Sequence, residues 1–396
     1  MKPGDTAKLP PGERRIIGVD MHPEVFTAAA LCGGDAATAQ VEWVHHRVNS
    51  QQLEPWVKQH VRPGDLLVLE ASGNSVETVE RMERAGGHAL ILESQKAGQI
   101  GKTYCKTDKV DAVKLARIYL SGLASAVWKP DATTRARREI FQRHRKTVQD
   151  TTRARNRLKG WFNEHNYRPA PGLRLTTPKA LSEVSRARPW TVIQTVLLTQ
   201  MFEDLWQAES RRKQLRALMA QEILTDPGLL KLIRLFGICH ITAFGLGAII
   251  GDIHRFRTPK QLVAYLGLNP SIHESAGHSH GGACGGHGRG DLRAVLVQAA
   301  HSILNHRHSP LHRWGWALCF RRNKKVAAVA IARKLTVACW YLLQGQFSSL
   351  EEIDQTLQTK IHKLATAVGR QGIKALGYVS VTAFREEKCK LLLQPT

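Results

Sequence analysis

The sequence predicts an α/β domain followed by a mostly helical chain, and three observations carry this prediction. Strand and helix patterns alternate through the first hundred residues. From Thr107 the chain turns helical and increasingly basic. A length of 396 residues leaves room for about two or three domains.

Five short apolar runs predict the strands of the first domain. They are Arg15–Met21, Val25–Cys32, Val41–Val48, Asp65–Glu70 and His88–Leu92. The first three are expected to pair in antiparallel fashion, and Ser72 or Asn74 is expected to cap a helix after the fourth. Three antiparallel strands, followed by parallel strands with crossover helices, is the order of a ribonuclease-H-like domain.

The next segment is the most basic part of the chain. Residues 101–160 contain 16 Lys or Arg against 5 Asp or Glu. A helix with so few apolar residues is not expected to be a core element, so it is either a solvated surface helix or an arm that binds nucleic-acid phosphates. We favour the arm, because charges this dense repel one another unless a polyanion offsets them. Its cations are Arg135, Arg137, Arg138, Arg143, Arg145, Lys146, Arg153, Arg155, Arg157 and Lys159.

Helical patterns continue beyond a break rich in proline and glycine at residues 168–178. A second long helix is expected over Pro189–Ile223, so the two helices form either an antiparallel hairpin or a dimerising coiled coil. The glycine-centred turn around Gly237 resembles a helix-hairpin-helix, whose role is either phosphate binding or plain helix packing. Later helices are expected at Leu292–His306 and Lys324–Leu343.

These patterns divide the chain into five parts. They are a disordered leader (1–14), the α/β domain (15–130), a basic helical arm and coiled-coil spacer (131–227), a mostly helical domain (228–345) and a C-terminal tail (346–396).

The charge balance indicates a polyanionic partner. Lys and Arg number 57 against 33 acidic residues, a formal net charge of +24, and cations that bind phosphates release condensed counterions. A membrane surface is the rival partner, but the longest apolar candidate, Ile241–Ile250, is far shorter than the roughly 20 residues that span a bilayer. The N-terminus lacks the apolar core of a signal peptide, and seven scattered cysteines without a C-x-x-C pair favour a reducing cytoplasm.

Four acidic residues form the first candidate site. Asp20 ends the first strand and Glu70 ends a later buried strand, whereas Asp108 and Asp111 lie three residues apart at a helix start and so share one helical face. Taken singly, each is more simply a turn or cap residue, but in this order they rarely coincide by chance. Carboxylate oxygens are the ligands that Mg²⁺ prefers, and paired ions stabilise both oxygens at a phosphodiester.

The second candidate site lies in the segment NPSIHESAGHSHGGACGGHGRGDLR, expected to be a loop over Ser275–Gly290. Its potential zinc ligands match no standard spacing, so a flexible glycine-rich loop is favoured over a zinc site. These ligands are His273, His278, His280, Cys284 and His287. Such a loop can approach a phosphate backbone closely. Composition does not choose a nucleophile among Ser271, Ser275 and Ser279.

Together, IGVD, LVLEASG and KTDKVDA resemble the DEDD transposases of the IS110 (IS-one-ten) insertion-sequence family. So do LIRLFGI, FRTPKQLVAYLGLNPSIHES and GDLRAVLVQAA, and the resemblance covers roughly residues 15–125 and 229–345. It implies a RuvC-like first domain in which Asp20, Glu70, Asp108 and Asp111 bind Mg²⁺.

The resemblance also implies a nucleophile and partners. Ser275 stands in a Glu-Ser pair five positions after Pro270, as the family's serine does, and that serine joins the acidic site from another subunit. A serine ester conserves the phosphodiester energy for rejoining. The implied partners are donor and target DNA, a noncoding bridge RNA as guide, and further copies of the chain in a dimer or tetramer of the bacterial cytoplasm. His273 departs from the family, where an aromatic residue is common.

Two rival interpretations follow from the same residues. In the first, the chain is a RuvC-like metal-dependent nuclease or resolvase in which metal-activated water cuts and Ser275 is incidental. In the second, it is a non-catalytic nucleic-acid-binding scaffold whose four acids are structural. A covalent protein–DNA adduct distinguishes the recombinase from the nuclease, and metal-dependent cleavage excludes the scaffold.

Overall fold

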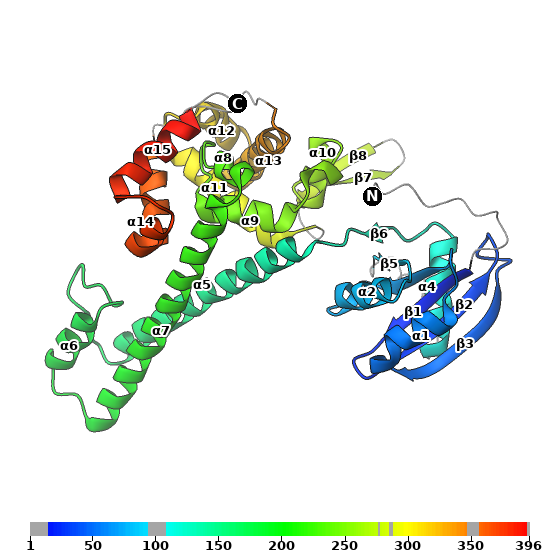
Figure 1. Ribbon diagram of the computed structural model, residues 1–396. Coiled ribbons are helices and arrows are strands. Elements are labelled where there is room, and N and C mark those ends of the chain that lie inside the picture. The colour runs from blue at the N-terminus through cyan, green and yellow to red at the C-terminus, as the bar shows by residue number, and fades with distance from the viewer. Residues whose placement is uncertain (1–14, 94–107, 276–277, 285–287, 347–355, 394–396) are drawn as a thin grey trace. The chain divides into compact units, whose positions relative to one another are not determined.

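A computed structural model describes residues 15–93, 108–275, 278–284, 288–346 and 356–393. The chain divides into two compact units, Met1–Pro130 and Asp131–Thr396 (Figure 1). Residues 1–14, predicted to be a leader, lie outside the described residues. The predicted mixture of an N-terminal α/β region and a mostly helical remainder is confirmed.

The first unit is built on a six-stranded sheet in the order β3-β2-β1-β4-β5-β6. The strands are β1 (Arg15–Met21), β2 (Val25–Cys32), β3 (Gln40–Asn49), β4 (Leu66–Glu70), β5 (Ala89–Leu92) and β6 (Ala126–Val127). The first three strands pair in antiparallel fashion, as predicted, and β4 and β5 continue the sheet parallel to β1. The short β6, which the sequence did not predict, returns antiparallel to β5.

Helices cover both faces of this sheet. On one face, Ile17 and Val19 of β1 pack against α1 (Leu53–His60) and α2 (Ser75–Arg84). On the other face, Ile16 packs with α4 (Asp108–Leu120). Because successive side chains of a strand point to opposite faces, a single apolar run fills both layers of the core.

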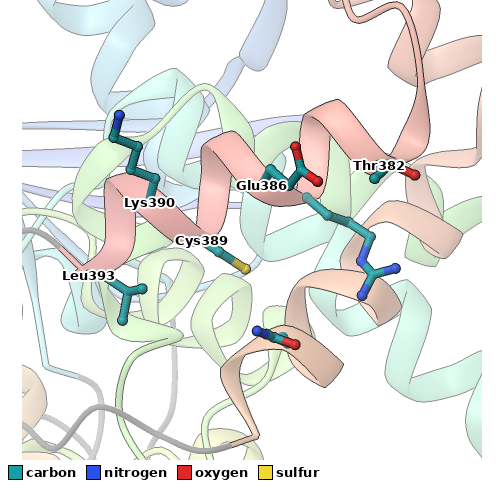
Figure 2. Close-up of a pocket in the computed structure, with 7 residues that line it drawn as sticks. Thr382, Glu386, Cys389, Lys390 and Leu393 are labelled. Atoms are coloured by element: carbon teal, nitrogen blue, oxygen red, sulfur yellow. The ribbon is translucent and has the colours of Figure 1, made fainter.

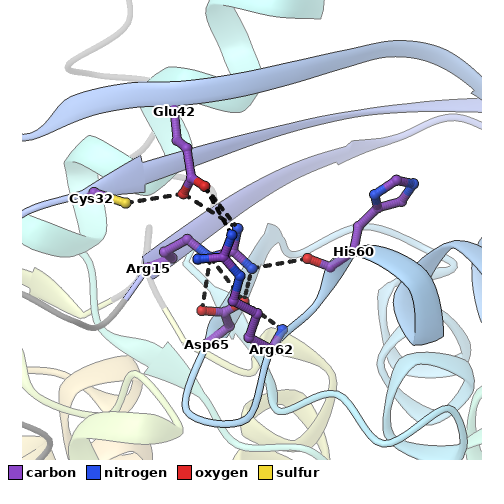
Figure 3. A network of polar contacts seen from close by, with 6 residues as sticks. All are labelled: Arg15, Cys32, Glu42, His60, Arg62 and Asp65. Atoms are coloured by element: carbon purple, nitrogen blue, oxygen red, sulfur yellow. Dashed lines mark hydrogen bonds and ion pairs between the residues drawn. The ribbon is translucent and has the colours of Figure 1, made fainter.

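A buried ion pair fastens the start of β1 to the loop before β4 (Figure 3). The Arg15 guanidinium, which is 2% exposed, donates to both carboxylate oxygens of Asp65 and to the carbonyl of His60. The hydrogen bonds to Asp65 raise the pKa of Arg15 despite its burial. Glu42 of β3 completes the network, accepting from the Arg15 guanidinium and from the Cys32 thiol. This end of the sheet is therefore held by charges that are paired and hydrogen-bonded.

The second unit begins with two long helices, α5 (Ala132–Glu164) and α7 (Val192–Leu224), with α6 (Pro178–Arg186) between them. Their contacts show that they run antiparallel. Arg137 pairs with Glu222 and Asp226, 85 and 89 residues away, whereas Arg157 pairs with Asp204, only 47 residues away. Partners that approach in sequence as the chain advances define a hairpin, so the hairpin alternative of the sequence analysis is the one observed within the chain (Figure 1).

The second unit also contains α9 (His240–Ile250), whose side chains are nearly all buried, and a set of further helices and strands. They are α8 (Pro227–Leu232), α10 (Pro259–Tyr265), β7 (Pro270–Ser275), β8 (His278–Cys284), α11 (Gly290–Asn305), α12 (Pro310–Arg321), α13 (Lys324–Leu343), α14 (Leu357–Ala375) and α15 (Val381–Leu393). Gly237, in the turn before α9, has a positive φ of 75°, and a Cβ there would lie 2.7 Å from the Ala299 carbonyl oxygen. Helix packing thus accounts for this turn.

Helix α13 corrects one expectation about membranes. An 18-residue window within its 20 residues has a mean hydropathy of 1.6, so by length and composition alone the helix passes as a membrane span, although the sequence analysis found no such candidate. Ten of its side chains are buried, among them Ile331 and Leu335 in the core of the second unit. A buried core helix explains this composition without a membrane.

Candidate active site and nucleic-acid interface

The sheet brings two of the four predicted acids together. In the parallel pair of β1 and β4, Val19 lies opposite Leu69, so the next positions, Asp20 and Glu70, are neighbours at the carboxyl ends of the strands. Neighbouring strands lie about 4.8 Å apart. The alternation of side chains places both acids on the face that α4 covers, following Ile16 and Leu66.

Helix α4, whose first turn contains Asp108 and Asp111, packs on that face. A Cβ built on Gly18 would lie 1.9 Å from the carbonyl oxygen of Ala112, so the helix backbone touches β1 two residues before Asp20. Ala112 and Ala116, both fully buried, face the sheet. Asp111 directly precedes Ala112, and Asp108 lies one helical turn before it. The backbone of the first turn of α4 therefore lies next to its contact with β1.

The side chains of Asp20, Glu70 and Asp111 are described, and all three are at least partly exposed to solvent. An oxygen of Asp20, whose side chain is 25% exposed, lies 3.5 Å from Nε2 of His22. Asp111 lies 3.6 Å from the Lys114 ammonium, and Glu70 is exposed. The side chain of Asp108 lies outside the described residues.

The fit of these acids to a metal ion rests on their chemistry. Among the described residues, no three His, Cys, Asp or Glu side chains are grouped closely enough to hold a metal. Because the side chain of Asp108 is not among the described residues, the four-acid site stays a prediction. A set of carboxylates alone suits Mg²⁺, which prefers hard oxygen ligands.

Ser275 is the last residue of β7, in a strand where the sequence analysis expected a loop. It pairs with His278 of β8 in a hairpin whose opposite end joins Pro270 to Cys284. The expectation of a loop over Ser275–Gly290 is therefore wrong for His278–Cys284. The glycines of this segment weaken the sequence pattern that predicts a strand. The hydrogen bonds between paired strands, however, need only backbone groups.

The side chains that would test the serine and zinc alternatives lie outside the described part of the hairpin. They are those of Ser271, His273, Ser275, His278, Ser279, His280 and His287. Cys284 is described, and its thiol lies 3.5 Å from the Leu268 carbonyl oxygen. Neither alternative is tested by these contacts.

The base of this hairpin is tightly anchored. The Arg289 amide donates to the Tyr265 carbonyl, and the Arg293 guanidinium donates to the carbonyls of Leu266 and Gly267. Gly288 has a φ of 79°, and a Cβ there would lie 2.6 Å from the Gly267 nitrogen. The described residues on the two sides of the hairpin are thus bonded to each other between the end of α10 and the start of α11.

The basic helix α5 has a core face, contrary to expectation. Its buried positions recur every three or four residues: Phe141, His144, Thr147, Thr151, Ala154, Leu158 and Trp161. Several are polar but are hydrogen-bonded along the helix, for example Thr151 to the Thr147 carbonyl at 2.8 Å. A search for apolar residues alone therefore missed the buried face of α5, because several of its buried residues are polar.

The ten predicted nucleic-acid-binding cations of α5 fall into different environments. Arg137 is used in ion pairs with α7 and the residue that caps α8, and Arg138 donates to the carbonyls of Ala248 and Ile249. Arg153 and Arg157 are exposed but pair with Asp150 and Asp204. Of the other six cations, three are exposed, namely Arg143, Lys146 and Lys159. The remaining three are half-buried, namely Arg135, Arg145 and Arg155.

A second basic cluster was not predicted from the sequence. Arg255 of the turn η2 (Ile253–Arg255) and Arg289 lie with Arg138 around Tyr265, and Asp291 accepts two hydrogen bonds from Arg289. These residues are far apart in sequence and have no common spacing, so the folded chain alone reveals them.

A pocket of about 700 Å³ lies beside α14 and α15, in the segment predicted to be a C-terminal tail (Figure 2). Figure 2 shows the residues that line it, which are Gln358, Thr382, Arg385, Glu386, Cys389, Lys390 and Leu393. Burial raises the pKa of the Cys389 thiol, and none of the predicted acids or serines lines the pocket.

Comparison with known proteins relates this chain to transposases of insertion sequences. The sequence model of the transposase IS116/IS110/IS902 family matches residues 230–314, which include Ser275. A probable family 20 transposase of Pseudomonas aeruginosa is 27% identical over 338 residues, covering 83% of this chain and 97% of the relative. The transposase for insertion sequence element IS1111A of Coxiella burnetii is 25% identical, covering 84% and 90%. Since 338 residues exceed either unit, the similarity spans both units, and the chain is similar to transposases of the IS116/IS110/IS902 family.

Proposed function

We propose that this transposase cuts and rejoins DNA through a four-carboxylate Mg²⁺ site and a serine nucleophile. The observation that carries the proposal is the register of β1 and β4, which makes Asp20 and Glu70 neighbours on the face that α4, the helix containing Asp108 and Asp111, covers. Similarity to insertion-sequence transposases supports the reaction class.

The first unit is proposed to be ribonuclease-H-like and RuvC-like. Its strand order supports this, since three antiparallel strands are followed by two strands parallel to β1. In such open sheets, functional groups gather at the carboxyl ends of the parallel strands, where Asp20 and Glu70 stand.

Each residue then has a defined task. Asp20, Glu70, Asp108 and Asp111 hold Mg²⁺, which when bound stabilises charge on the oxygens of the scissile phosphate. The Ser275 hydroxyl attacks phosphorus, and a Ser–phosphate ester forms as the bond to one sugar oxygen breaks. The serine proton is transferred away, and the departing oxygen takes up a proton. Attack on that ester by a sugar hydroxyl of a second strand reverses these steps, so the strands are rejoined with no net loss of ester bonds.

Partners follow from the same proposal. The exposed cations of α5 bind nucleic-acid phosphates, the DNA is the donor and target of the element, and a bridge RNA selects both. Ser275 reaches the acids of another copy, so the active form is a dimer or tetramer. Copurification of a structured RNA encoded beside the gene tests the guide.

The deciding experiment traps a protein–DNA adduct. Labelled element-end DNA is incubated with the protein, the guide RNA and Mg²⁺, then denatured and analysed by gel and peptide mass. The wild-type protein and the matched controls Ser271→Ala and Ser279→Ala form the adduct, whereas Ser275→Ala and Asp20→Ala do not. If Ser275→Ala still recombines DNA, the serine step is wrong. Cleavage without any adduct would instead support a metal-dependent nuclease.

A further inference from the structure

Four arginines gather at the base of the β7–β8 hairpin. Arg138 and Arg145 lie seven residues apart on one face of α5, Arg255 ends η2, and Arg289 precedes α11. Electrostatic coupling joins them: Arg289 and Arg255 act on Arg138, and Arg145 acts on Asp291, the partner of Arg289. All four are half-buried, so they are accessible from solvent yet partly desolvated.

The surrounding backbone fixes the orientation of two of these arginines. Nε of Arg138 donates to the Ala248 carbonyl at 3.0 Å, and Nε of Arg255 donates to the Ile250 carbonyl at 3.0 Å. The Arg255 guanidinium also lies over the Tyr265 ring, with Cζ 4.4 Å from its centroid. Both therefore approach the carboxyl end of α9, where the helix dipole favours cations.

Capping of α9 accounts for Arg138 and Arg255 but not for the rest of the cluster. The Arg289 guanidinium instead donates two hydrogen bonds to the Asp291 carboxylate, from Nε at 3.1 Å and from Nη2 at 2.7 Å. The pKa of Arg138 is lowered, mainly because the guanidinium is buried and also because Arg289 and Arg255 lie near it. The described carboxylates that act on the cluster are Asp252 and Asp291. Guanidinium groups gathered where water is partly excluded are suited to bind an anion, and a phosphate in particular.

The position of the cluster specifies which anion it meets. The Arg289 amide donates to the carbonyl of Tyr265, the last residue of α10, which precedes the hairpin in the chain. Pro270 lies at the base of the hairpin and Ser275 at its tip, five residues away, or about 17 Å at 3.3 Å per residue. That span corresponds to about five base pairs of duplex DNA at 3.4 Å each. A strand lying along the hairpin would thus reach the arginines a few nucleotides from the serine.

We propose that Arg138, Arg145, Arg255 and Arg289 form a binding site for a backbone phosphate of DNA, which positions the strand that Ser275 attacks. The second clause rests on the proposed serine function, whereas phosphate binding does not. The guanidinium fork matches two phosphate oxygens, and the contact is independent of base sequence. Asp291 competes with the phosphate for Arg289 and so limits the affinity.

Opposite charge changes at Arg289 and Asp291 test the site. Full-length protein carrying Ser275→Ala, which separates binding from chemistry, is titrated into a fluorescein-labelled 30-base-pair duplex of arbitrary sequence at several salt concentrations. Arg289→Gln should weaken binding about five- to tenfold and reduce the slope of log affinity against log salt by about one unit. Asp291→Asn should strengthen binding severalfold, since asparagine keeps the oxygen that accepts from the Leu292 amide.

Controls separate this role from a structural one. Arg370→Gln, at an exposed arginine of α14, should leave affinity and slope unchanged, and Arg289→Lys, which keeps the charge, should largely restore the slope. Equal losses of affinity in Arg289→Gln and Asp291→Asn, together with lower melting temperatures, would overturn the proposal. So would an effect confined to an RNA hairpin of equal charge. If the predicted shifts appear but wild-type protein forms no adduct, the phosphate site stands and the serine chemistry fails.

Discussion

At the scale of single residues, Gly18 determines how closely α4 approaches the acidic positions. Its missing side chain lets the Ala112 carbonyl oxygen reach a point 1.9 Å from where a Cβ would stand. Backbone atoms on both sides leave no flexible group to yield. The distance between Asp20 and the first turn of α4 thus depends on the absence of one methyl group.

We therefore expect Gly18→Ala to destabilise the protein by about 1–3 kcal/mol, as overpacking does, and to reduce strand cleavage because α4 is displaced. Urea unfolding of the full chain and a cleavage assay measure the two effects. The matched control is Gly34→Ala in the same unit, where a Cβ meets nothing within 4 Å. Unchanged stability and cleavage in Gly18→Ala would show that α4 is not fixed to β1 at this point.

At the scale of elements, the α5–α7 hairpin and α9 enclose two histidines that must stay neutral. His144 of α5 and His240 of α9 are 6% and 3% exposed, and neither ring nitrogen of His240 has a hydrogen-bond partner among the described residues. The pKa of His144 is lowered to about 4 by its burial and by the positive charges of Arg216 and Arg212 on α7. Burial, Arg216, His144 and Lys363 of α14 lower the pKa of His240 to about 4.

This element predicts a pH dependence of stability. A folded pKa near 4, below the ordinary 6.5, means that the stabilisation is complete above about pH 6.5 and is lost as pH falls towards 4, by at most about 3 kcal/mol per histidine. We expect His240→Gln to reduce the slope of unfolding free energy against pH between 6.5 and 4. The control His254→Gln, at an exposed position, should keep the wild-type slope. Identical slopes in all three proteins would contradict the assignment.

The same elements show what sequence reasoning reached and where it stopped. β1 and β2 were predicted to the residue, because β-branched runs between polar turns have few alternatives. The buried face of α5 was missed because His144, Thr147 and Thr151 are polar, and their burial depends on packing and hydrogen bonds along the helix. The register that brings Asp20 beside Glu70, and the meeting of Arg138 with Arg289, depend on tertiary pairing that no local pattern contains.

At the scale of the whole molecule, the apolar surface near the start of α7 bears on assembly. Val192, Ile193, Val196 and Leu197 lie within two turns and are 82%, 72%, 51% and 43% exposed. Contiguous apolar patches on a helix are typical of contacts between proteins. We take this stripe as the surface on which the proposed oligomer forms.

Ile193→Asp should accordingly shift the protein towards monomer in sedimentation analysis, because burying an unpaired carboxylate is costly. Val379→Asp provides the control, since Val379 is 93% exposed and lies apart from the stripe, between α14 and α15. An unchanged mass distribution in Ile193→Asp would assign the oligomer to another surface.

The antiparallel pairing of α5 and α7 sets a rule for changes in chain length. Because Arg137 meets Glu222 and Arg157 meets Asp204, residues added to one helix misalign every later pair unless the other helix gains the same number. Matched insertions of seven residues, two helical turns, would preserve the facing sides and carry α6 about 10 Å further out at 1.5 Å per residue. The reach of this hairpin can thus vary while the packing around α9 stays the same.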